Sequence, residues 1–557
     1  MNKRKKILIT CALPYVNGYC HIGHLRTYIP GDFLNRWLKK LGYKTSFICG
    51  SDTHGTPILF QAEKEGVRPE KIVEKYHNHF ENVFRKISIK FDKYGSTDSP
   101  TNHLLTREIV KRLSEKGYIY SKKIMLPYCP KCNRFLPDRY IVGTCPYCGF
   151  EEARGDECEK CGKHLEPGEI KDAKCKICGH PAELREDEHY FFKLSAFTDF
   201  LMEYLKQLRG TENAINYARR WVSEGLRDWC ITRRIEWGVK FPGREDLVLY
   251  VWVDAPIGYI SITKEMCDER GENWREYWKD KAQIIHFIGE EITYHHCIFW
   301  PAMLKGAGYN LPYAVIASGM ITLNNSKLSK TRGNVIWVEQ DYLANGLHPD
   351  LLRYYILSYT SHTKSLDFSW KAFMNKVNSE LVGNFGNFAY RTLSLTYRNY
   401  GEIPVADIEL EVKERIQLLV SKIEDFLFNY EFKKLIDEIM ALSSWGNGYL
   451  QKKEPWKQVR RAPEEAKRTL RTCLQILKAM SILMEPVMPI KMEELWRQLG
   501  QDGTVEKAPI DEAVREIEEG RKIPKPKPLF KPLTEEEVRK LEEVLKSRVD
   551  KSGPGGT

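Results

Sequence analysis

The sequence lacks any long uninterrupted hydrophobic run. No segment approaches the roughly 18 uncharged apolar residues that a membrane-spanning helix needs. The basic and then apolar start, MNKRKKILITCALPYV, is not followed by a small-x-small cleavage site, and Pro14 and Asn17–Gly18 interrupt its apolar run. We therefore expect a soluble, cytoplasmic protein with no membrane partner, whose cysteines are mostly reduced or bound to metal rather than paired in disulfides.

The chain also lacks an excess of acidic residues. Its 86 lysines and arginines outnumber its 75 aspartates and glutamates, which gives a formal net charge of +11. This balance argues mildly for a polyanionic partner, although a lysine-rich surface alone would give the same number. With 557 residues the chain is too long for a single hydrophobic core, so we expect two to four domains.

Apolar residues are almost absent from GFEEARGDECEKCGKHLEPGEIKDAKCKICGHP, a segment that needs metal to fold. Four CxxC pairs lie in and just before it, and two such pairs can close one tetrahedral site of four thiolates. The sequence therefore predicts two structural zinc ions. A redox pair or an iron–sulfur cluster fits less well, since a redox site needs only one CxxC. The spacing leaves open which pairs share an ion; the predicted ligands are Cys129, Cys132, Cys145, Cys148, Cys158, Cys161, Cys175 and Cys178.

A strand, a helix and a second strand are predicted near the start of the chain. The run from Ile7 to Ala12 indicates a buried parallel strand that ends in a turn. Apolar residues then recur every four positions from Leu25 to Trp37, which predicts a helix with a kink or break at Pro30–Gly31. The second strand, in KTSFICGSDTHGTP, also has a polar exit. This order is typical of a doubly wound α/β sheet.

Two histidines, His21 and His24, fall where the first strand gives way to the helix. Residues three apart share a face of a first helical turn, where free N–H groups and the helix dipole favour an anion. Gly23 removes the side chain that would keep a ligand off the backbone. The pattern alone is weak, because two surface histidines that cap a turn would look the same. About 300 residues later, Lys327 and Lys330 flank a serine in the loop SKLSKTRGN.

HIGH followed by KLSKT resembles the signature pair of the class I aminoacyl-tRNA synthetases, with KLSKT in the place of KMSKS. Leu328 and Thr331 depart from that signature, but its essential second lysine is kept. The segments TCALPYVNGYCHIGHLRTYIPGD, CGSDTHGTPI, YVWVDAPIGYI and FIGEEITYHHCIFWPAML, with the CxxC pairs, look like the methionyl-tRNA synthetases over nearly the whole chain. Valyl and leucyl synthetases are longer and carry an editing insertion, and cysteinyl synthetases use a catalytic zinc that closed four-thiolate sites do not suit.

The resemblance implies a Rossmann-like, doubly wound parallel-sheet catalytic domain that is split by a zinc-knuckle insertion. An all-α anticodon-binding domain would follow, and from about residue 380 apolar residues at i, i+3 and i+4 also predict an antiparallel helix bundle. We expect the first catalytic half at 1–117, the insertion at 118–250 with its knuckles at about 126–182, and the second catalytic half at 251–325. The signature loop and stem-contact region would occupy 326–380, the helix bundle 381–522, and a linker with a short helix 523–557.

The resemblance also implies a reaction. The methionine carboxylate attacks the α-phosphorus of ATP, pyrophosphate leaves, and the terminal adenosine of tRNA(Met), initiator tRNA included, takes the methionyl group. Mg²⁺ would bridge the phosphates of ATP. The implied catalytic residues are His21, His24, Lys327, Lys330 and Arg233, and the implied ATP site consists of His21, Gly23, His24, Gly289, Glu291, Ile321 and Lys330.

The substrate methionine and the anticodon have implied sites of their own. A thioether favours aromatic edges and no competing charge, and Asp52 would hold the substrate ammonium group. The implied methionine site consists of Ala12, Leu13, Tyr15, Asp52, Trp252, Ala255, Pro256, Tyr259, Ile292 and His296. The positions that match anticodon-binding residues of the family are Asn384, Asn387, Arg391 and Trp456.

The tail begins as a proline–lysine linker, and Thr534 and Glu537 form a capping-box pattern for one final helix. In the family such a tail can fold back over the catalytic domain, and some members continue into a dimerising RNA-binding domain. This chain stops short of that domain, so we expect a monomer.

Two other functions use part of the pattern. A zinc-knuckle RNA-binding protein on a degenerate synthetase scaffold is disfavoured by intact His21, His24, Asp52 and Lys330. A relative of pantetheine-phosphate adenylyltransferase is disfavoured because it has no use for the helical C-terminal half.

Overall fold

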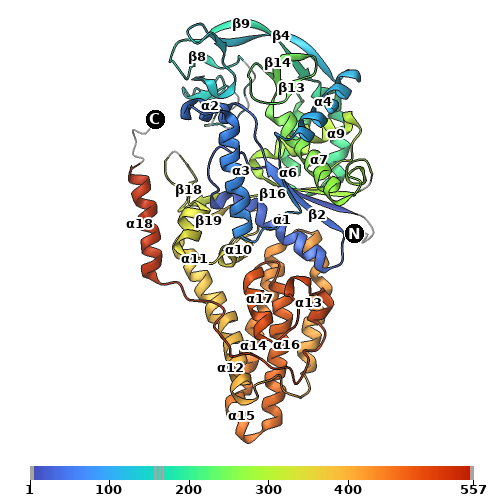
Figure 1. Cartoon of the computed structure of the whole chain (residues 1–557), viewed down its shortest axis with the longest axis vertical. Helices are drawn as coiled ribbons and strands as arrows, with labels where there is room; N and C mark the ends of the chain where they lie inside the picture. Colours follow the sequence, from blue (N-terminus) through green and yellow to red (C-terminus); the bar gives the residue numbers. More distant parts are fainter. Residues whose placement is uncertain are drawn as a thin grey trace.

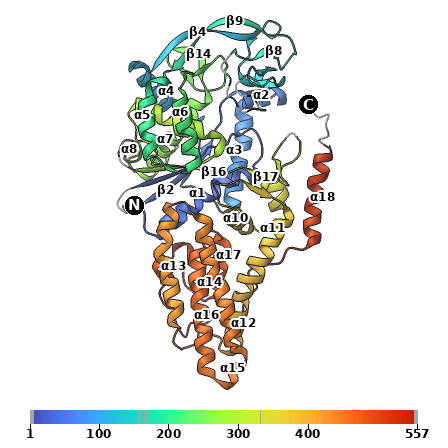
Figure 2. The same ribbon diagram turned by 180° about the vertical axis from the view of Figure 1, so that it is seen from behind.

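The computed structural model describes residues 6–155, 158, 160, 161, 163, 165, 168–280, 282–330 and 332–551. The molecule is elongated, with the cysteine-rich insertion at one end, an α/β layer in the middle and a helix bundle at the other end (Figures 1 and 2). None of the helices within these ranges is both long enough and apolar enough to cross a membrane.

A six-stranded parallel sheet forms the middle layer, in the strand order β10-β16-β15-β1-β2-β3. Strand β1 pairs with β2 on one side and with β15 on the other. The connections on the two sides of β1 therefore run in opposite directions across the sheet. The carboxyl ends of β1 and β15 therefore open a crevice at the switch point, as the doubly wound prediction requires. The strands are β1 (Ile7–Cys11), β2 (Thr45–Ser51), β3 (Lys93–Ser96), β10 (Arg209–Gly210), β15 (Gln283–Gly289) and β16 (Ala314–Ser318).

The helix after β1 continues through Pro30, so the expected break is wrong. This helix, α1 (Ile22–Lys40), is buried along most of its length, and tertiary packing offsets the hydrogen bond that proline cannot donate. Gly31 allows the helix to lie close against the sheet, because an added Cβ would come within 2.7 Å of the Cys11 Sγ and 3.2 Å of the Phe47 ring. The packing fixes the amino end of α1 at the switch point.

The insertion leaves the main layer as a long antiparallel ribbon of β4 (Ile119–Cys129) and β9 (Glu183–Phe192), at the top of Figure 1. The cysteine-rich module at its tip contains β5 (Arg134–Phe135), β6 (Ile141–Thr144), β7 (Ala153–Arg154) and β8 (Lys171–Cys175). Strands β11 (Trp229–Cys230), β12 (Thr232–Arg233), β13 (Lys240–Phe241) and β14 (Arg244–Leu249) lead back to the middle layer.

The chain rejoins the main sheet earlier than the expected boundary at residue 250. Strand β10 pairs in parallel with β16, and the flanking helices α5 (Thr198–Gln207) and α6 (Glu212–Glu224) share a core with α7 (Val251–Arg270). A two-residue edge strand is too short to give a periodic signal in the sequence. Helices α2 (Thr56–Glu65), α3 (Pro69–Lys86), α4 (Pro100–Glu115), α8 (Arg275–Trp278) and α9 (Trp300–Ala307) complete this layer.

The C-terminal half begins with a small sheet that carries the lysine loop, made of β17 (Ile321–Leu323), β18 (Ser326–Lys327) and β19 (Leu366–Phe368). A helix bundle follows, drawn in orange in Figure 1. Its helices and those leading to it are α10 (Pro349–Ser358), α11 (Trp370–Lys376), a π-helical stretch (Val377–Gly386), α12 (Asn387–Asn399), α13 (Leu410–Phe428), α14 (Phe432–Lys453), α15 (Pro455–Arg461), α16 (Pro463–Met484) and α17 (Pro489–Gln498).

The tail forms the expected final helix, α18 (Glu535–Lys551). The capping box is present: the Thr534 N–H donates to Glu537 at 2.8 Å, and the Glu537 N–H donates to the Thr534 hydroxyl at 3.2 Å. The helix lies beside α11, and Arg548 donates to Asp341 and to the Val335 carbonyl, both at 2.8 Å. The tail therefore folds back against the segment that follows the lysine loop.

A buried cluster of charges joins α1 to the bundle. Asp32 lies 2.8 Å from Arg36 and 2.7 Å from Arg353 of α10. Glu485, just after α16, lies 2.6 Å from Arg36 and 3.2 Å from Lys40. Each of these side chains is nearly excluded from solvent, so each charge depends on its partners.

We expect Arg353→Met to lower the free energy of unfolding by about 3–5 kcal/mol, because it leaves a buried carboxylate short of a cation. It also removes the donor to the Val487 and Pro486 carbonyls. Urea denaturation followed by circular dichroism measures the change. Arg220→Met, which breaks an exposed pair with Glu224, is the control and should cost no more than about 1 kcal/mol. An equal loss of unfolding free energy in the two variants would show that the buried charge cluster does not depend on Arg353.

Candidate active site

The crevice at the switch point opens into a cavity of about 700 Å³, a volume within the range of small-molecule and cofactor sites. Its walls come from the ends of β1, β2, β15 and β16, the start of α1, the lysine loop and the cysteine-rich module. Most of the predicted catalytic, ATP and methionine residues line it: Ala12, Leu13, Tyr15, His21, Gly23, His24, Asp52, Arg233, Trp252, Gly289, Glu291, Ile292, Ile321, Lys327 and Lys330.

Four residues predicted to contact methionine do not line this cavity: Ala255, Pro256, Tyr259 and His296. All four are buried behind its wall, and the Tyr259 hydroxyl and the His296 Nε2 are hydrogen-bonded at 2.8 Å. The His296 Nδ1 faces the carbonyl of Ile292, which does line the cavity, at 3.1 Å. These residues therefore support the wall in this structure.

His21 caps the amino end of α1, and His24 lies in its first turn. Their rings stack with centroids 3.8 Å apart. The backbone N–H of His21 donates to the His24 Nδ1 at 3.0 Å. A neutral His24 ring therefore carries its proton on Nε2 and can donate a hydrogen bond from that atom. Burial, and then the charge of Lys330, lower the pKa of His21 to about 3; burial, His21 and Lys330 hold the pKa of His24 well below its usual value. Both rings are neutral donors near pH 7.

The lysine loop closes onto this histidine turn. Asn324 and Asn325 have φ values of 50° and 61° and form the two-residue turn between β17 and β18. Farther along, the Lys330 Nζ lies 3.1 Å from the position that a Cβ on Gly18 would take. The Lys330 side chain as a whole is exposed, but partial desolvation of its ammonium group in this position lowers its pKa. Thr331, the other departure from the signature, falls outside the residues that the structure describes.

The segment after the loop pairs directly with the histidine turn. The Ile22 N–H donates to the Ile336 carbonyl at 3.0 Å, and the Val338 N–H donates to the Cys20 carbonyl at 2.9 Å. The backbone thus ties together two segments that lie about 300 residues apart in the sequence.

Asp52 follows β2 and is only 8% exposed. Burial, and then the charge of Asp254, raise the pKa of the Asp52 carboxyl well above its ordinary value. Its Oδ1 has no hydrogen-bond partner among the residues described. A buried carboxylate with an open oxygen suits a cationic group of a ligand, which would supply the missing partner.

Asp138 and Arg139, which were not predicted from the sequence, also line the cavity and come from the cysteine-rich module. The Asp138 carboxylate accepts from the Arg233 Nε at 3.1 Å. Burial acts to lower the pKa of Arg233, but the Asp138 charge outweighs it and the pKa stands above its usual range. Asp138 has a φ of 46°, a left-handed conformation that often marks a functional turn. The polar PDR in RFLPDRY was the available signal, but its place between CxxC pairs suggested a purely structural role.

His295 is another cavity residue that was not predicted from the sequence; its ring stacks on Trp252 with centroids 3.6 Å apart. Both residues line the cavity, so a stacked aromatic pair forms part of its wall. A single histidine beside another, in YHHC, gave no basis for choosing between them.

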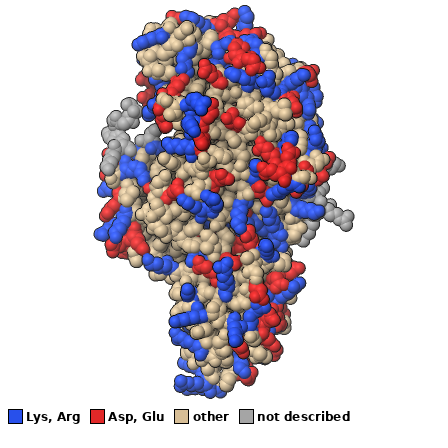
Figure 3. Space-filling model, in the orientation of Figure 1, with Lys and Arg blue, Asp and Glu red and all other residues tan. Residues whose placement is uncertain are grey.

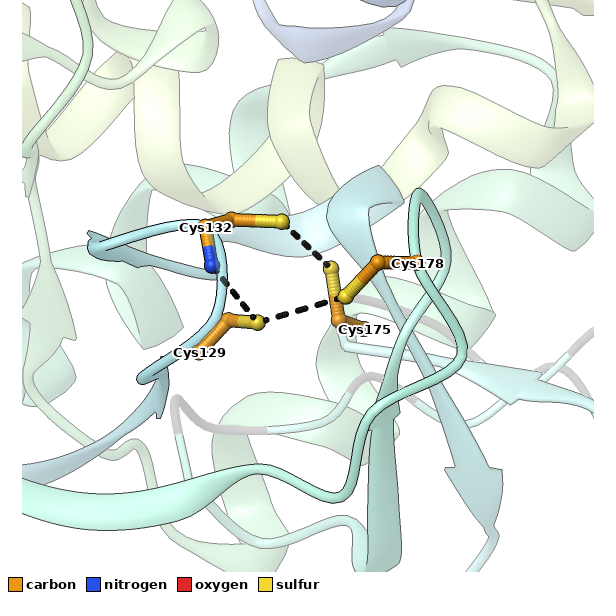
Figure 4. Close-up of side chains that lie close together, drawn as sticks. All are labelled: Cys129, Cys132, Cys175 and Cys178. Carbon is orange, nitrogen blue, oxygen red and sulfur yellow. Dashed lines mark hydrogen bonds between the residues drawn. The ribbon is translucent and has the colours of Figure 1, made fainter.

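The predicted metal ligands form two separate four-cysteine clusters. In one of them, shown in Figure 4, the Sγ atoms are 3.5 Å apart for Cys129–Cys178 and 3.9 Å apart for Cys132–Cys175. Sulfurs at the corners of a tetrahedron about 2.3 Å from a zinc ion lie about 3.8 Å from one another. The donor set and its spacing therefore fit a metal ion such as zinc.

The other cluster has the same dimensions, with 3.9 Å for Cys145–Cys161 and 3.5 Å for Cys148–Cys158. The first CxxC pair of the sequence thus meets the fourth, and the second meets the third. The order of the pairs in the sequence could not decide this arrangement.

The predicted anticodon residues lie at the far end of the bundle. The Arg391 guanidinium stands over the Trp456 ring, 5.3 Å from its centroid. Asn384 belongs to the π-helical stretch and accepts from Asn447 at 2.8 Å, whereas Asn387 is exposed at the start of α12. Trp456 lies in the first turn of α15, the helix at the lower tip of Figure 1. Figure 3 shows both basic and acidic side chains on this end of the molecule.

This combination of a doubly wound sheet, a histidine turn at its switch point and a lysine loop that closes over a cavity defines a class I aminoacyl-tRNA synthetase. Residues 7–393 match the family described as tRNA synthetases class I (M), and residues 402–549 match the anticodon binding domain of methionyl tRNA ligase. The chain belongs to the methionine–tRNA ligase family.

Similar proteins agree with this assignment. The chain is 54% identical over 547 residues to a methionine–tRNA ligase of Methanosarcina mazei, covering 98% of this chain and 76% of that protein. It is also 54% identical over 552 residues to one of Methanothrix thermoacetophila, covering 99% and 82%. A solved structure of Mycobacterium tuberculosis methionyl-tRNA synthetase in complex with methionyl-adenylate superimposes with a TM-score of 0.79 at 25% identity, covering 94% of this chain and 99% of that one.

We expect Gly23→Ala to lower the rate of methionine-dependent ATP–pyrophosphate exchange by about 100-fold. The added Cβ would lie 2.9 Å from the His21 Nδ1 and 3.0 Å from the Leu328 Cδ1, which must move the histidine turn or the loop. Gly448→Ala, at an exposed helical position with open space around it, is the control and should leave the rate unchanged. A fully active Gly23→Ala enzyme would show that this close contact is not needed.

Proposed function

We propose that this chain activates L-methionine with ATP to form methionyl-adenylate, and then transfers the methionyl group to the terminal adenosine of tRNA(Met), initiator tRNA included. The observation that carries the proposal is the closure of the lysine loop over the histidine turn at the mouth of the cavity. Neutral imidazoles and a mobile ammonium group can surround a triphosphate there without any covalent nucleophile.

Each group has a role in this proposal. His21 and His24 donate hydrogen bonds to the phosphates, and Gly23 lets the nucleotide approach the backbone. Lys330 stabilises the charge that develops as pyrophosphate leaves, with Lys327 beside it. The ATP enters with Mg²⁺, whose preferred ligands are phosphate oxygens and water. Gly289, Glu291 and Ile321, which line the cavity, would contact the adenosine.

The methionine would lie along the surface formed by Ala12, Leu13, Tyr15, Trp252 and Ile292. Its ammonium group would pair with Asp52, whose Oδ1 is free to accept. Arg233, which is hydrogen-bonded to Asp138, would lie on the side of the cavity where the methionine carboxylate reacts. Ala255, Pro256, Tyr259 and His296 would shape the thioether pocket from behind.

We further propose that the two cysteine clusters hold structural zinc ions. Four thiolates leave no open position for a substrate. The small core of the module combines four of these cysteines with a few apolar side chains: Leu136, Tyr140, Ile141, Ala153, Leu165 and Ile170. By placing Asp138 and Arg139 in the cavity, the folded module also completes the active site. We expect the enzyme to act as a cytoplasmic monomer.

We expect Lys330→Ala to lower kcat of the exchange reaction by about 10²- to 10³-fold, because one donor to the developing charge is lost. The KM for methionine should change much less. Steady-state exchange kinetics give both values. Lys371→Ala, which removes an exposed lysine of α11, is the matched control. A variant that lost methionine affinity but kept its rate would refute the role given to Lys330.

We expect Trp456→Ala to raise the KM for tRNA(Met) about tenfold, because stacking on one base is worth about 1–3 kcal/mol. ATP–pyrophosphate exchange without tRNA should be unaffected, since the tip of the bundle does not line the cavity. Aminoacylation assays with varied tRNA measure the effect. Tyr397→Ala, at an exposed aromatic residue of α12, serves as the control. An unchanged KM for tRNA in Trp456→Ala would place the anticodon elsewhere.

A further inference from the structure

His54 is a buried histidine that the proposed reaction does not use. It lies two residues after Asp52 and is 1% exposed. Its Nδ1 is 2.6 Å from a carboxylate oxygen of Asp254, and its Nε2 is 3.2 Å from one of Asp98. A neutral imidazole has only one N–H, so both contacts are hydrogen bonds only if the ring is an imidazolium. Burial acts to lower the pKa of His54, but Asp254 and Asp98 raise it to about 10.

Charged and titratable groups from several elements surround His54. Asp254 projects from α7, Asp98 lies between β3 and α4, and His103 of α4 places its ring 5.3 Å from that of His54. Asp52 is on the same loop, and its pKa is raised by burial and by Asp254 but lowered by His54. His54 is therefore the cation that pairs with Asp254 on the side of the cavity where Asp52 lies.

Backbone contacts hold this loop in place. The Tyr15 hydroxyl donates to the His54 carbonyl at 2.5 Å, and the Trp237 indole donates to the Thr53 carbonyl at 2.7 Å. The Trp237 ring also packs edge-on against the His54 ring, with centroids 5.5 Å apart. These contacts fix the position of His54 relative to the rest of the loop that carries Asp52.

A metal ion is the competing explanation, because donor atoms of His54, Asp98 and His103 lie within 4.8 Å of one another. However, the Asp98 oxygen already lies at hydrogen-bond distance from both rings, 3.2 Å from His54 and 3.0 Å from His103. Ion pairing accounts for every contact of the cluster, so no metal is required.

We propose that His54 is a positioning residue for methionine: held as an imidazolium between Asp254 and Asp98, it favours the ionised form of the Asp52 carboxylate, which receives the substrate ammonium group. This inference rests on the proposed function, in which Asp52 binds that group. Recognition of the substrate ammonium group would then depend partly on His54, which does not contact the substrate itself.

The test is the pH dependence of the KM for methionine in ATP–pyrophosphate exchange. In His54→Gln the Asp52 carboxyl loses a neighbouring cation, so it takes up a proton at a higher pH than in the wild type. The KM should then begin to rise at a higher pH as the solution is acidified, with the midpoint of the rise displaced by about one unit or more. kcat should change less than the KM.

Asp254→Asn gives the opposite sign. It removes the negative charge that raises the pKa of Asp52, while Asp98 still pairs with His54. The acid limb of the KM should therefore move to lower pH. His103→Asn, which touches Asp98 but not Asp254, is the matched control and should leave the midpoint where it is in the wild type.

Several results would overturn the inference. A KM raised equally at every pH in His54→Gln would show a merely structural role, as would shifts of the same sign in His54→Gln and Asp254→Asn. Metal analysis should find two zinc ions in the wild type and in both variants; a third equivalent that is lost from His54→Gln would mean that the cluster binds metal instead. If the wild type shows no methionine-dependent exchange at all, it is the proposed function that fails.

Discussion

Asp32 is the buried charge on which the arrangement of the active site depends. Arg36 and Arg353 neutralise it inside the protein, and Glu485 extends the same cluster to the start of the α16–α17 connection. Burial alone would raise the pKa of Asp32, but the two arginines hold it below its usual value. Because Asp32 belongs to α1, the histidine turn at one end of that helix and the anticodon-binding bundle at the other are fastened to a single rigid element.

The cavity separates neutral donors from fixed charges. His21 and His24 are neutral because burial and the charge of Lys330 disfavour their protonation. They can therefore donate hydrogen bonds to an anion without adding positive charge to the site. On the side where we propose that the amino acid binds, Asp52 and Asp254 lie near His54, whose pKa is raised by Asp254 and Asp98. The two halves of a nucleotide–amino acid pair thus meet different electrostatic environments within one cavity.

The layer order, the switch point and the metal ligands followed from local patterns: a buried strand with a polar exit, a helical period of four, and repeated CxxC pairs. Other features depended on contacts between distant residues. Helix α1 continues through Pro30 where Gly31 packs closely against the sheet. Strand β10 is defined by its pairing with β16, where Gly210 lies opposite Val315. Asp138 and Arg139 join the active site because the module folds over it, and no spacing within RFLPDRY encodes that.

The nesting of the cysteine pairs sets an order of assembly. Cys145, Cys148, Cys158 and Cys161 enclose a short stretch of chain, so their site can close with little loss of loop entropy as soon as that stretch is made. The outer site joins Cys129 and Cys132 to Cys175 and Cys178, which follow the inner site in the sequence. With metal bound as we propose, the closed inner site would shorten the free chain that the outer site has to close.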